Sequence, residues 1–264
     1  PTHFEFNQRI AAQVFEKRMA LRNLTPEKKA SGVNEVLEPF GYALRHNPLL
    51  SSYAYQLFKD DQLVLDDVGP FWQATRREDG ADFLLPIETG QGKPLLVSRD
   101  KVEAWDSVFT PTIYYGNELI VAQVEGDKVV VRRLSDDQVL YSQPVTSSPV
   151  EMPIKTFQAW QGHWVLEADG VLVIDGQNIN QQLGYDAIFN WVVLQGQPFF
   201  FFTKGQRTGI FFAGKEQNAA YDEVIHYQCC EPAAFNPGHE LSIVWFYALR
   251  NGMWYYVEAG IFNS

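Results

Sequence analysis

A short pattern that recurs along the chain constrains its fold more than any other feature. The pattern is a large apolar residue, an aspartate, any residue, and then Val or Ile. The clear copies are Leu65-Asp66-Asp67-Val68, Trp105-Asp106-Ser107-Val108, Tyr185-Asp186-Ala187-Ile188 and Tyr221-Asp222-Glu223-Val224. They begin 40, 80 and 36 residues apart, so a degenerate copy is expected in the double step, where Tyr141-Ser142-Gln143-Pro144-Val145 lies. Self-similarity at a period of about forty residues is typical of repeat architectures.

Each copy is followed by the same series of segments: an aromatic strand, a polar turn, a long apolar strand, a second turn and another strand. Short strands broken by Gly, Asn, Asp and Pro predict an all-β fold. The expected long strands lie at residues 82–87, 119–124, 163–167, 198–203 and 242–249. The sequence therefore predicts five repeated units.

The two ends of the repeat array suggest how it closes. The last unit ends at Ser264 without a tetrapeptide strand of its own, whereas the strand at 62–68 precedes the first unit. Pairing these two ends would remove exposed sheet edges. We therefore predict a five-bladed β-propeller over residues 61–264, closed by the N-terminal strand at 62–68.

The first sixty residues have a different periodicity. One apolar stripe at helical spacing contains Ile10, Ala11, Val14 and Phe15, and a second contains Val33, Val36, Leu37 and Phe40. Thr25-Pro26 and Asn47-Pro48 each place a capping side chain before a proline at a first helical position. The pattern predicts helices at 5–22, 26–44 and 48–58, which form a helical segment, residues 1–60, packed on the propeller.

Charge and hydropathy exclude several kinds of partner. The chain carries 32 acidic and 21 basic residues, a formal charge of −11, which disfavours binding to the phosphates of nucleic acid. The longest apolar run, around Phe199 to Phe202, is too short to cross a bilayer, so membrane insertion is not expected. Pro1 at the start fits removal of an initiator methionine, which favours a cytoplasmic over a secreted product, although it also fits a trimmed signal peptide.

The recurring aspartates suggest either a ring of carboxylates or a structural device. A residue that recurs in every unit is more often structural, because Asp at a strand end accepts hydrogen bonds from nearby backbone N–H groups. We expect these side chains to hold the turn to the next blade.

One unit resembles a known repeat family. Gly205-Gln206-Arg207-Thr208-Gly209-Ile210, then Gly214 and Tyr221-Asp222-Glu223-Val224, are similar to the WG-type repeat, which has a Gly-rich hairpin and then a Tyr-Asp-Glu-like strand. Residues 170–188 share the pattern loosely, and the Trp-Gly pair that names the family is absent. The resemblance implies binding more than catalysis.

The least repetitive segment, 226–239, is the first candidate site, because departures from a repeat are where function tends to be added. Its candidate binding residues are His226, Tyr227, Cys229, Cys230, His239 and the neighbouring Trp245. Thiolate and imidazole suit zinc or copper, but the spacing matches no standard zinc module. We expect no metal and no cofactor. Adjacent cysteines form no disulfide framework, and a vicinal disulfide between them stays open.

Trp160, His163 and Trp164 form a second candidate binding site. Two indoles that flank an imidazole could stack on a sugar or hold a peptide, and blade-to-blade packing is the alternative.

The motifs favour a binding module over an enzyme. The predicted function is a non-catalytic module that recognises a small molecule, glycan or peptide at the propeller channel mouth. The alternative is a glycan-active hydrolase of the five-bladed propeller class, which needs two carboxylates at a set separation. The acids available for it are Glu118, Glu151, Glu167, Asp175 and Glu258. The sequence leaves the oligomeric state open.

Overall fold

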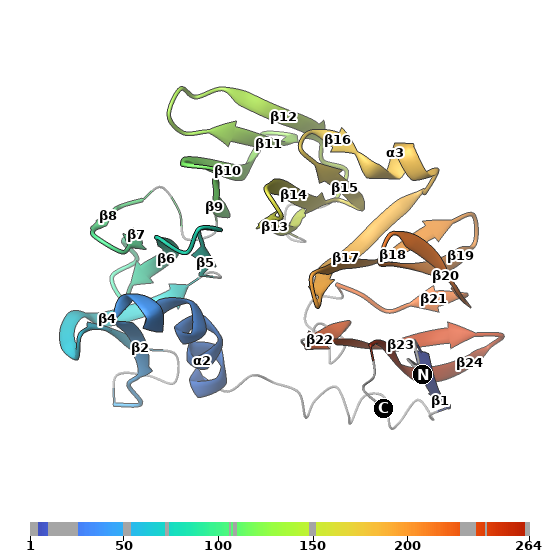
Figure 1. Ribbon diagram of the computed structural model, residues 1–264, viewed down its shortest axis with the longest axis horizontal. Coiled ribbons are helices and arrows are strands. Elements are labelled where there is room, and N and C mark those ends of the chain that lie inside the picture. The colour runs from blue at the N-terminus through green and yellow to red at the C-terminus, as the bar shows by residue number, and fades with distance from the viewer. Residues whose placement is uncertain are drawn as a thin grey trace. The chain divides into compact units, whose positions relative to one another are not determined.

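The computed structural model describes residues 5–9, 26–49, 54–71, 74–105, 107, 110–147, 152–227, 236–240 and 242–261. These residues belong to two compact units (Figure 1). Unit 1 comprises Pro1–Asn23, Ser147–Thr156 and Leu166–Ser264, and unit 2 comprises Leu24–Thr146 and Phe157–Val165. The described part of the chain is mostly strand, arranged in five sheets, so the all-β prediction is confirmed.

The first sheet lies in unit 2 and has seven strands in the order β2-β3-β4-β6-β7-β8, with β5 also paired to β6. These strands are β2 (Tyr42–His46), β3 (Tyr55–Lys59), β4 (Gln62–Phe71), β5 (Thr75–Arg76), β6 (Phe83–Thr89), β7 (Pro94–Ser98) and β8 (Val102–Ala104). β4 and β5 follow one another along the same edge of β6, because Val68 opposes Thr89 while Thr75 opposes Leu84.

The next three sheets are four-stranded, and each uses consecutive strands in sequence order. The second contains β9 (Thr112–Tyr115), β10 (Glu118–Glu125), β11 (Lys128–Arg133) and β12 (Val139–Pro144). The third contains β13 (Ile154–Trp160), β14 (His163–Ala168), β15 (Val171–Ile174) and β16 (Gln177–Asn178), followed by helix α3 (Ile179–Leu183). The fourth contains β17 (Ala187–Leu194), β18 (Gln197–Lys204), β19 (Arg207–Phe212) and β20 (Lys215–Tyr221).

The fifth sheet, in unit 1, joins the two ends of the described chain. Its path is β21-β23-β24-β1, and β22 also pairs with β23. The strands are β21 (Glu223–Val224), β22 (Gly238–Glu240), β23 (Ile243–Arg250), β24 (Met253–Gly260) and β1 (Glu5–Arg9). β1 runs antiparallel to β24, with Glu5 opposite Ala259 and Arg9 opposite Tyr255.

The five repeated units of the sequence correspond to these five sheets. Each expected long strand is found, as β6, β10, β14, β18 and β23. The strand assigned to closure was wrong. β4, which contains residues 62–68, lies inside the first sheet between β3 and β6, and it is β1 that completes the fifth sheet.

The helical prediction for the first sixty residues is confirmed only in its middle part. α2 (Pro26–Leu37) begins at the expected proline and is followed by a 3-10 turn, Glu38–Phe40. The helices expected at 5–22, 26–44 and 48–58 are wrong over β1, β2 and β3, which are strands; residues 10–25 lie outside the described part. The domain boundary at residue 60 stays a prediction.

Two-residue turns of one type join many of the strands. Asp169-Gly170 links β14 to β15, and Asn251-Gly252 links β23 to β24. All four residues have φ between 52° and 75°. Positive φ at both central positions is the type I′ geometry, which matches the twist of paired strands and favours Asn or Asp before Gly. Local sequence therefore sets the hairpin registers.

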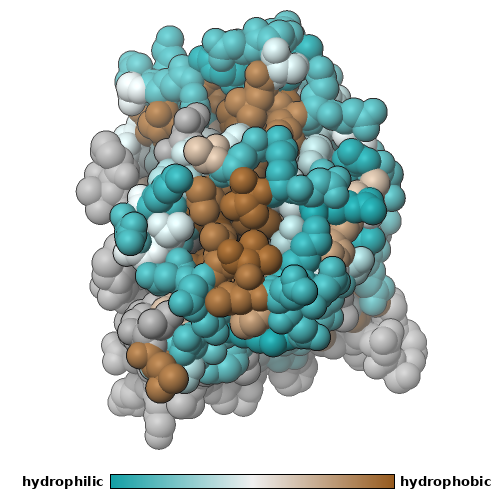
Figure 2. Space-filling model, turned by 90° about the vertical axis from the view of Figure 1, so that its left-hand side faces the viewer, coloured by the Kyte–Doolittle hydropathy of each residue, from teal (hydrophilic) through white to brown (hydrophobic). Residues whose placement is uncertain are grey.

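Each unit has its own apolar core. In unit 2, Val33 and Leu37 of α2 pack with Leu57 and Phe83 of the first sheet. Figure 2 faces the part of this unit that contains α2, β2 and β4, and shows apolar side chains surrounded by hydrophilic ones. Exposed apolar residues in this part include Leu63. In unit 1, the fourth and fifth sheets share one core, in which Phe201 contacts Phe246 with ring centroids 4.7 Å apart.

Candidate functional site

The segment that begins at His226 meets a buried carboxylate in unit 1. Glu167 on β14 is 1% exposed. Its carboxylate accepts from the Tyr227 hydroxyl at 2.6 Å, from the backbone N–H of Asn190 at 2.9 Å and from that of Trp191 at 2.8 Å. The Asn190 N–H is shared, because it also donates to the Tyr227 oxygen at 2.9 Å. One side chain therefore joins β14, β17 and the start of the irregular segment.

An irregularity in β17 presents these two N–H groups. Asn190 has φ +56°, and the pairing of β17 with β18 shifts register between Phe189 and Val192. Such a bulge leaves backbone groups without ladder partners, and Glu167 accepts from them. A buried carboxylate with three donors of this kind is a structural cap, because the arrangement shows no access for a substrate.

Burial sets the protonation behaviour of this cluster. It raises the pKa of Glu167, against the hydrogen bonds from Tyr227, Trp191 and Asn190. It also raises the pKa of Tyr227, as does the adjacent Glu167 charge. His226 stacks on Phe189 with ring centroids 3.6 Å apart, and burial lowers its pKa. His226 therefore stays neutral to a lower pH than an exposed histidine does.

The far end of the irregular segment is also fixed. Asn236 is 2% exposed and donates from Nδ2 to the carbonyl of Ile225 at 2.5 Å. His239 is exposed on β22, while Trp245 lies opposite Gly238, where a Cβ would collide with the indole. No group of three metal-ligating side chains occurs among the described residues. Cys229 and Cys230 lie outside the described part of the chain.

The second candidate site divides between core and surface. Trp164 is 3% exposed and packs with Phe157 and Tyr141, both at 6.3 Å between ring centroids. Trp160 is half-buried, and its ring lies 6.4 Å from that of the exposed His163. Trp164 is therefore a packing residue, and the two indoles differ in burial.

The acids considered for hydrolysis have separate partners in the described residues. Glu118 pairs with Arg133 at 3.1 Å, and Glu258 accepts from the Tyr256 hydroxyl at 2.7 Å. Glu167 is enclosed by its three donors, and Asp175 occupies a turn with φ +48°. Glu151 lies outside the described residues. Glu118, Glu167 and Glu258 therefore each have partners of their own, whereas a hydrolase site requires two carboxylates that flank the scissile bond.

A small pocket in unit 2 is lined by β5, β9 and β13, which are strands of three successive sheets. The pocket has a volume of about 170 Å³ and includes Thr75 and Arg76 of β5, Ile113 and Tyr114 of β9, and Gln158 of β13. The Thr75 hydroxyl donates to the carbonyl of Thr112 at 3.3 Å, which ties β5 to β9. We call it the first-strand pocket.

The charged groups beside the first-strand pocket are mostly paired with one another. The Tyr114 hydroxyl donates to Asp82 at 2.5 Å, and Arg77 donates to Asp79 at 2.8 Å. Burial and the bond to Asp82 raise the pKa of Tyr114. Burial also opposes ionisation of Asp82, but the donors Tyr114, Arg99 N and Phe83 N outweigh it and lower its pKa. None of the ion pairs described for this part of the chain involves Arg76.

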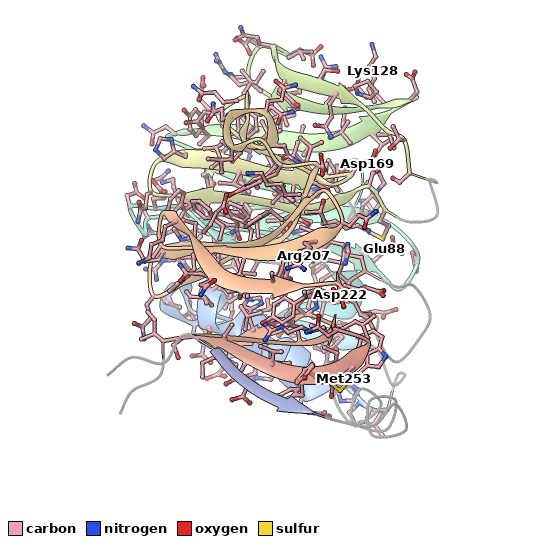
Figure 3. All side chains as sticks on the ribbon, turned by 90° about the vertical axis from the view of Figure 1, so that its right-hand side faces the viewer. Glu88, Lys128, Asp169, Arg207, Asp222 and Met253 are labelled. Atoms are coloured by element: carbon pink, nitrogen blue, oxygen red, sulfur yellow. The ribbon has the colours of Figure 1, made fainter. Side chains whose placement is uncertain are left out.

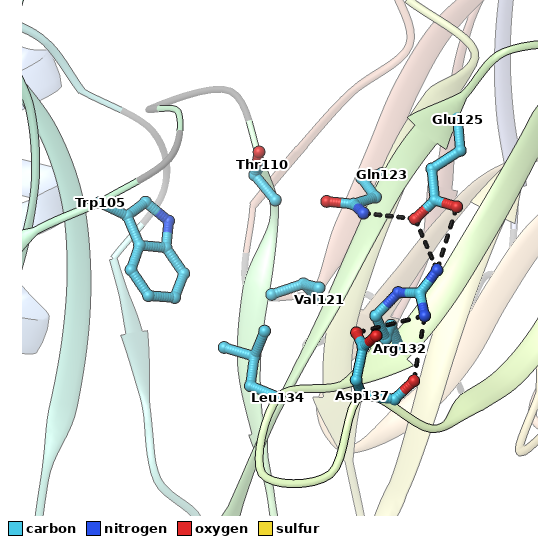
Figure 4. Close-up of a pocket in the computed structure, with 8 residues that line it drawn as sticks. All are labelled: Trp105, Thr110, Val121, Gln123, Glu125, Arg132, Leu134 and Asp137. Carbon is cyan, nitrogen blue, oxygen red and sulfur yellow. Dashed lines mark hydrogen bonds and ion pairs between the residues drawn. The ribbon is translucent and has the colours of Figure 1, made fainter.

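A larger pocket in unit 2 lies against the second sheet. Its volume is about 320 Å³, and Trp105 forms one wall (Figure 4). The other lining residues are Thr110, Val121, Gln123, Glu125, Arg132, Leu134 and Asp137. We call it the Trp105 pocket.

Sequence reasoning missed both pockets as sites. It placed Trp105 only as the first residue of a repeat copy and gave no role to Arg76 or Arg132. The relevant sequence signal is the alternation of side chains along a strand, which places consecutive arginines on opposite faces of the sheet. The sequence could not show which face of the sheet carries a pocket.

The strand order and the two pockets define this protein as an all-β repeat protein with polar pockets in one of its units. No protein-family model matches the chain, and no curated protein matches it significantly. Among solved structures, it is similar to the Cps50 (Swd1) β-propeller domain of Myceliophteria thermophila, at 10% identity and TM-score 0.37, covering 78% of this chain and 76% of that one.

Two further solved structures are similar over most of the chain. One is a prolyl endopeptidase, at 14% identity and TM-score 0.43; the match covers 80% of this chain and spans only 38% of that one. The other is the AfRom2 CNH domain, at 8% identity and TM-score 0.36, covering 86% and 79%. Because these TM-scores are below 0.5, the class stands on this chain's own strands. Among the described helices, none is long and apolar enough to span a bilayer.

Proposed function

We propose that the chain is a five-bladed β-propeller that serves as a non-catalytic binding module. Five antiparallel sheets in chain order support the blade count. The pairing of β1 with β24 supports closure, because an N-terminal strand that completes the last blade removes a sheet edge.

The first-strand pocket is the observation that carries the binding function. In a propeller, the blades surround a central channel, and β5, β9 and β13 would lie beside it. A pocket where these three strands meet is where a channel ligand would bind. Its volume of about 170 Å³ suits a single side chain or a few-atom group of a larger ligand.

The polar groups of this pocket favour an acidic group of a small molecule, glycan or peptide. Arg76 is exposed and has no described ion pair, while Arg77, Asp79 and Asp82 are already paired. A guanidinium matches the two oxygens of a carboxylate, and Gln158 offers an amide beside it. The separate partners of the candidate acids count against a hydrolase.

This function is tested by calorimetric titration with glutarate and with a capped Ala-Glu-Ala peptide. Both probes are expected to bind the wild type, and Arg76→Ala is expected to weaken them about tenfold, a loss typical of a charge-assisted contact. Lys128→Ala removes an equal charge from an exposed hairpin and should change affinity less than twofold. Equal losses in both variants would overturn the site.

The enzymatic alternative is tested on the same samples. Chromogenic glycosides are expected to show no turnover by the wild type above that of a buffer blank. Turnover that disappears in Glu118→Gln or Glu258→Gln would replace the binding module with the hydrolase.

A further inference from the structure

The Trp105 pocket is built on one face of the second sheet. Val121, Gln123 and Glu125 occupy alternate positions of β10 and so point to the same side. Arg132 on β11 lies opposite Val121 in register, which places its side chain on that face too. Figure 4 shows Trp105 across the pocket from this row, on the segment that precedes β9.

The polar groups on this face form one connected cluster. Arg132 donates to both oxygens of Glu125, at 2.9 and 3.0 Å, and to the carbonyl of Asp137 at 3.0 Å. It also pairs with the Asp137 carboxylate at 3.2 Å. Gln123 donates to Glu125 at 2.5 Å. Two carboxylates thus share one guanidinium, and the pocket carries a net negative charge.

The Glu125 carboxylate is ionised at neutral pH, and both carboxylates are reachable from outside. Hydrogen bonds from Gln123 and then from Arg132 lower the pKa of Glu125. The Glu125 side chain is 38% exposed and that of Asp137 81% exposed, whereas Arg132 is only 20% exposed. An incoming group therefore meets the anions before it meets the arginine.

Trp105 adds an aromatic wall. Its indole Nε1 is buried and has no hydrogen-bond partner among the described residues. The face of an indole attracts cations more strongly than any other side-chain ring. A negative pocket with such a wall attracts positive groups and repels carboxylates and phosphates.

We propose that the Trp105 pocket binds an organic cation, an ammonium or guanidinium group held between the indole and the Glu125 and Asp137 carboxylates. This site is separate from the first-strand pocket and does not depend on the function proposed for it.

Two arginines on β11, each paired with two acids, provide a matched test. Arg132 and Arg133 are consecutive and face opposite sides of the sheet, and each pairs with two acids: Glu125 and Asp137, or Glu118 and Asp136. Glu125→Gln/Asp137→Asn neutralises the pocket. Glu118→Gln/Asp136→Asn makes the same charge change on the other face.

The experiment is calorimetric titration of the full chain with a capped Ala-Arg-Ala peptide, its Ala-Gln-Ala counterpart and spermidine. The Arg peptide is expected to bind and the Gln peptide not to. The pocket double variant should lose about tenfold or more in affinity and the opposite-face variant less than twofold. Trp105→Phe, which keeps an aromatic wall, should lose a few-fold. Circular dichroism checks that each variant is folded.

Each outcome decides the proposal. If both double variants lose affinity equally, binding depends only on the overall charge of −11, and the proposed site is overturned. The site is likewise overturned if the Gln peptide binds as well as the Arg peptide. If the Arg peptide and spermidine both bind, the site recognises the cation alone. If one double variant unfolds, Trp105→Phe replaces it as the test. A weakened affinity then supports the site, and an unchanged affinity overturns it.

Discussion

Glu167 shows how one side chain can hold several distant segments. Its carboxylate contacts residues 23, 24 and 60 positions away in sequence, at Asn190, Trp191 and Tyr227. The sequence marks Glu167 only as an available acid in an expected strand. Its burial depends on a bulge in the next sheet, which no local pattern signals. Side chains whose role is set by distant backbone are the ones that sequence reasoning cannot assign.

Glu167→Gln is expected to destabilise the protein by about 2–4 kcal/mol, because an amide NH₂ would face donors that now bind a carboxylate oxygen. Tyr227→Phe, which removes one donor and leaves the two backbone bonds, should cost about 1–2 kcal/mol. Urea unfolding measures both. A Glu167→Gln variant as stable as the wild type would show that the carboxylate is not a cap.

The same variant gives a pH test. The folded pKa of Glu167 is raised by burial, so between its ordinary value and that raised pKa the folded state binds more protons than the unfolded state. Stability contributed by this group therefore falls as pH rises through that window. The advantage of wild type over Glu167→Gln should be larger near pH 4.5 than at pH 8. An advantage that grows with pH would mean that the three donors outweigh burial.

Among the elements, the tetrapeptide copies mark connections between successive sheets in unit 1. Asp186 accepts from the backbone N–H of Gly205 at 2.6 Å, and Asp222 accepts from that of Asn251 at 2.6 Å. Each bond reaches the hairpin between the second and third strands of the following sheet, and Figure 3 shows Asp222 between Arg207 and Met253 at these hairpins. The structural role expected of these aspartates is confirmed at both positions. Asp66 differs, because it accepts from Gln56 on β3.

Asp222→Ala is expected to lower the free energy of unfolding by about 1 kcal/mol, through loss of a charge-assisted bond to an exposed turn. Glu223→Ala is the control, since this neighbouring acid is also exposed and should change stability by less than about 0.5 kcal/mol. Thermal or urea unfolding of the pair checks the difference. If both substitutions change stability equally, Asp222 does not hold the turn.

Strands could be predicted where alternating apolar residues and turn residues in the sequence agreed. A helix was wrongly predicted at 48–58, where a capping residue before proline was the main signal. Asn47 does accept from the N–H of Leu49 at 3.1 Å, the bond expected of a cap. Its own N–H, however, bonds to the carbonyl of Ala54 at 2.9 Å, which closes the connection between β2 and β3. An Asx turn serves helix starts and loops alike, so Asn-Pro could not decide between them.

At the scale of the whole molecule, the connectivity is less local than the repeats suggest. Unit 1 gathers the first residues, a short middle segment and the last third of the chain, while most of unit 2 lies between them. The five units were readable because they repeat. The closing strand could not be predicted from the sequence, because Glu5–Arg9 has no tetrapeptide and its pairing with β24 is made by backbone groups.

Deletion of residues 1–9 is expected to destabilise unit 1, because it exposes the backbone edge of β24. Hydrogen exchange should show faster exchange at β24 residues that now face β1, while β10 and β11 in unit 2 stay protected. A synthetic peptide of residues 1–12 should restore protection. Unchanged exchange at β24 would contradict the pairing, and loss of protection throughout the described chain would show that the two units unfold together.

The pairing of Glu5 with Ala259 also sets an order in time. A ribosome delivers β1 early and β24 late, so the first strand remains unpaired while the intervening sheets emerge and fold. Hairpins such as β23-β24 close over two residues, whereas this contact must bring together segments separated by nearly the whole described chain, at an entropic cost that grows with the logarithm of that separation. We therefore expect β1 to pair with β24 last, so that the fifth sheet is the last to be completed during synthesis.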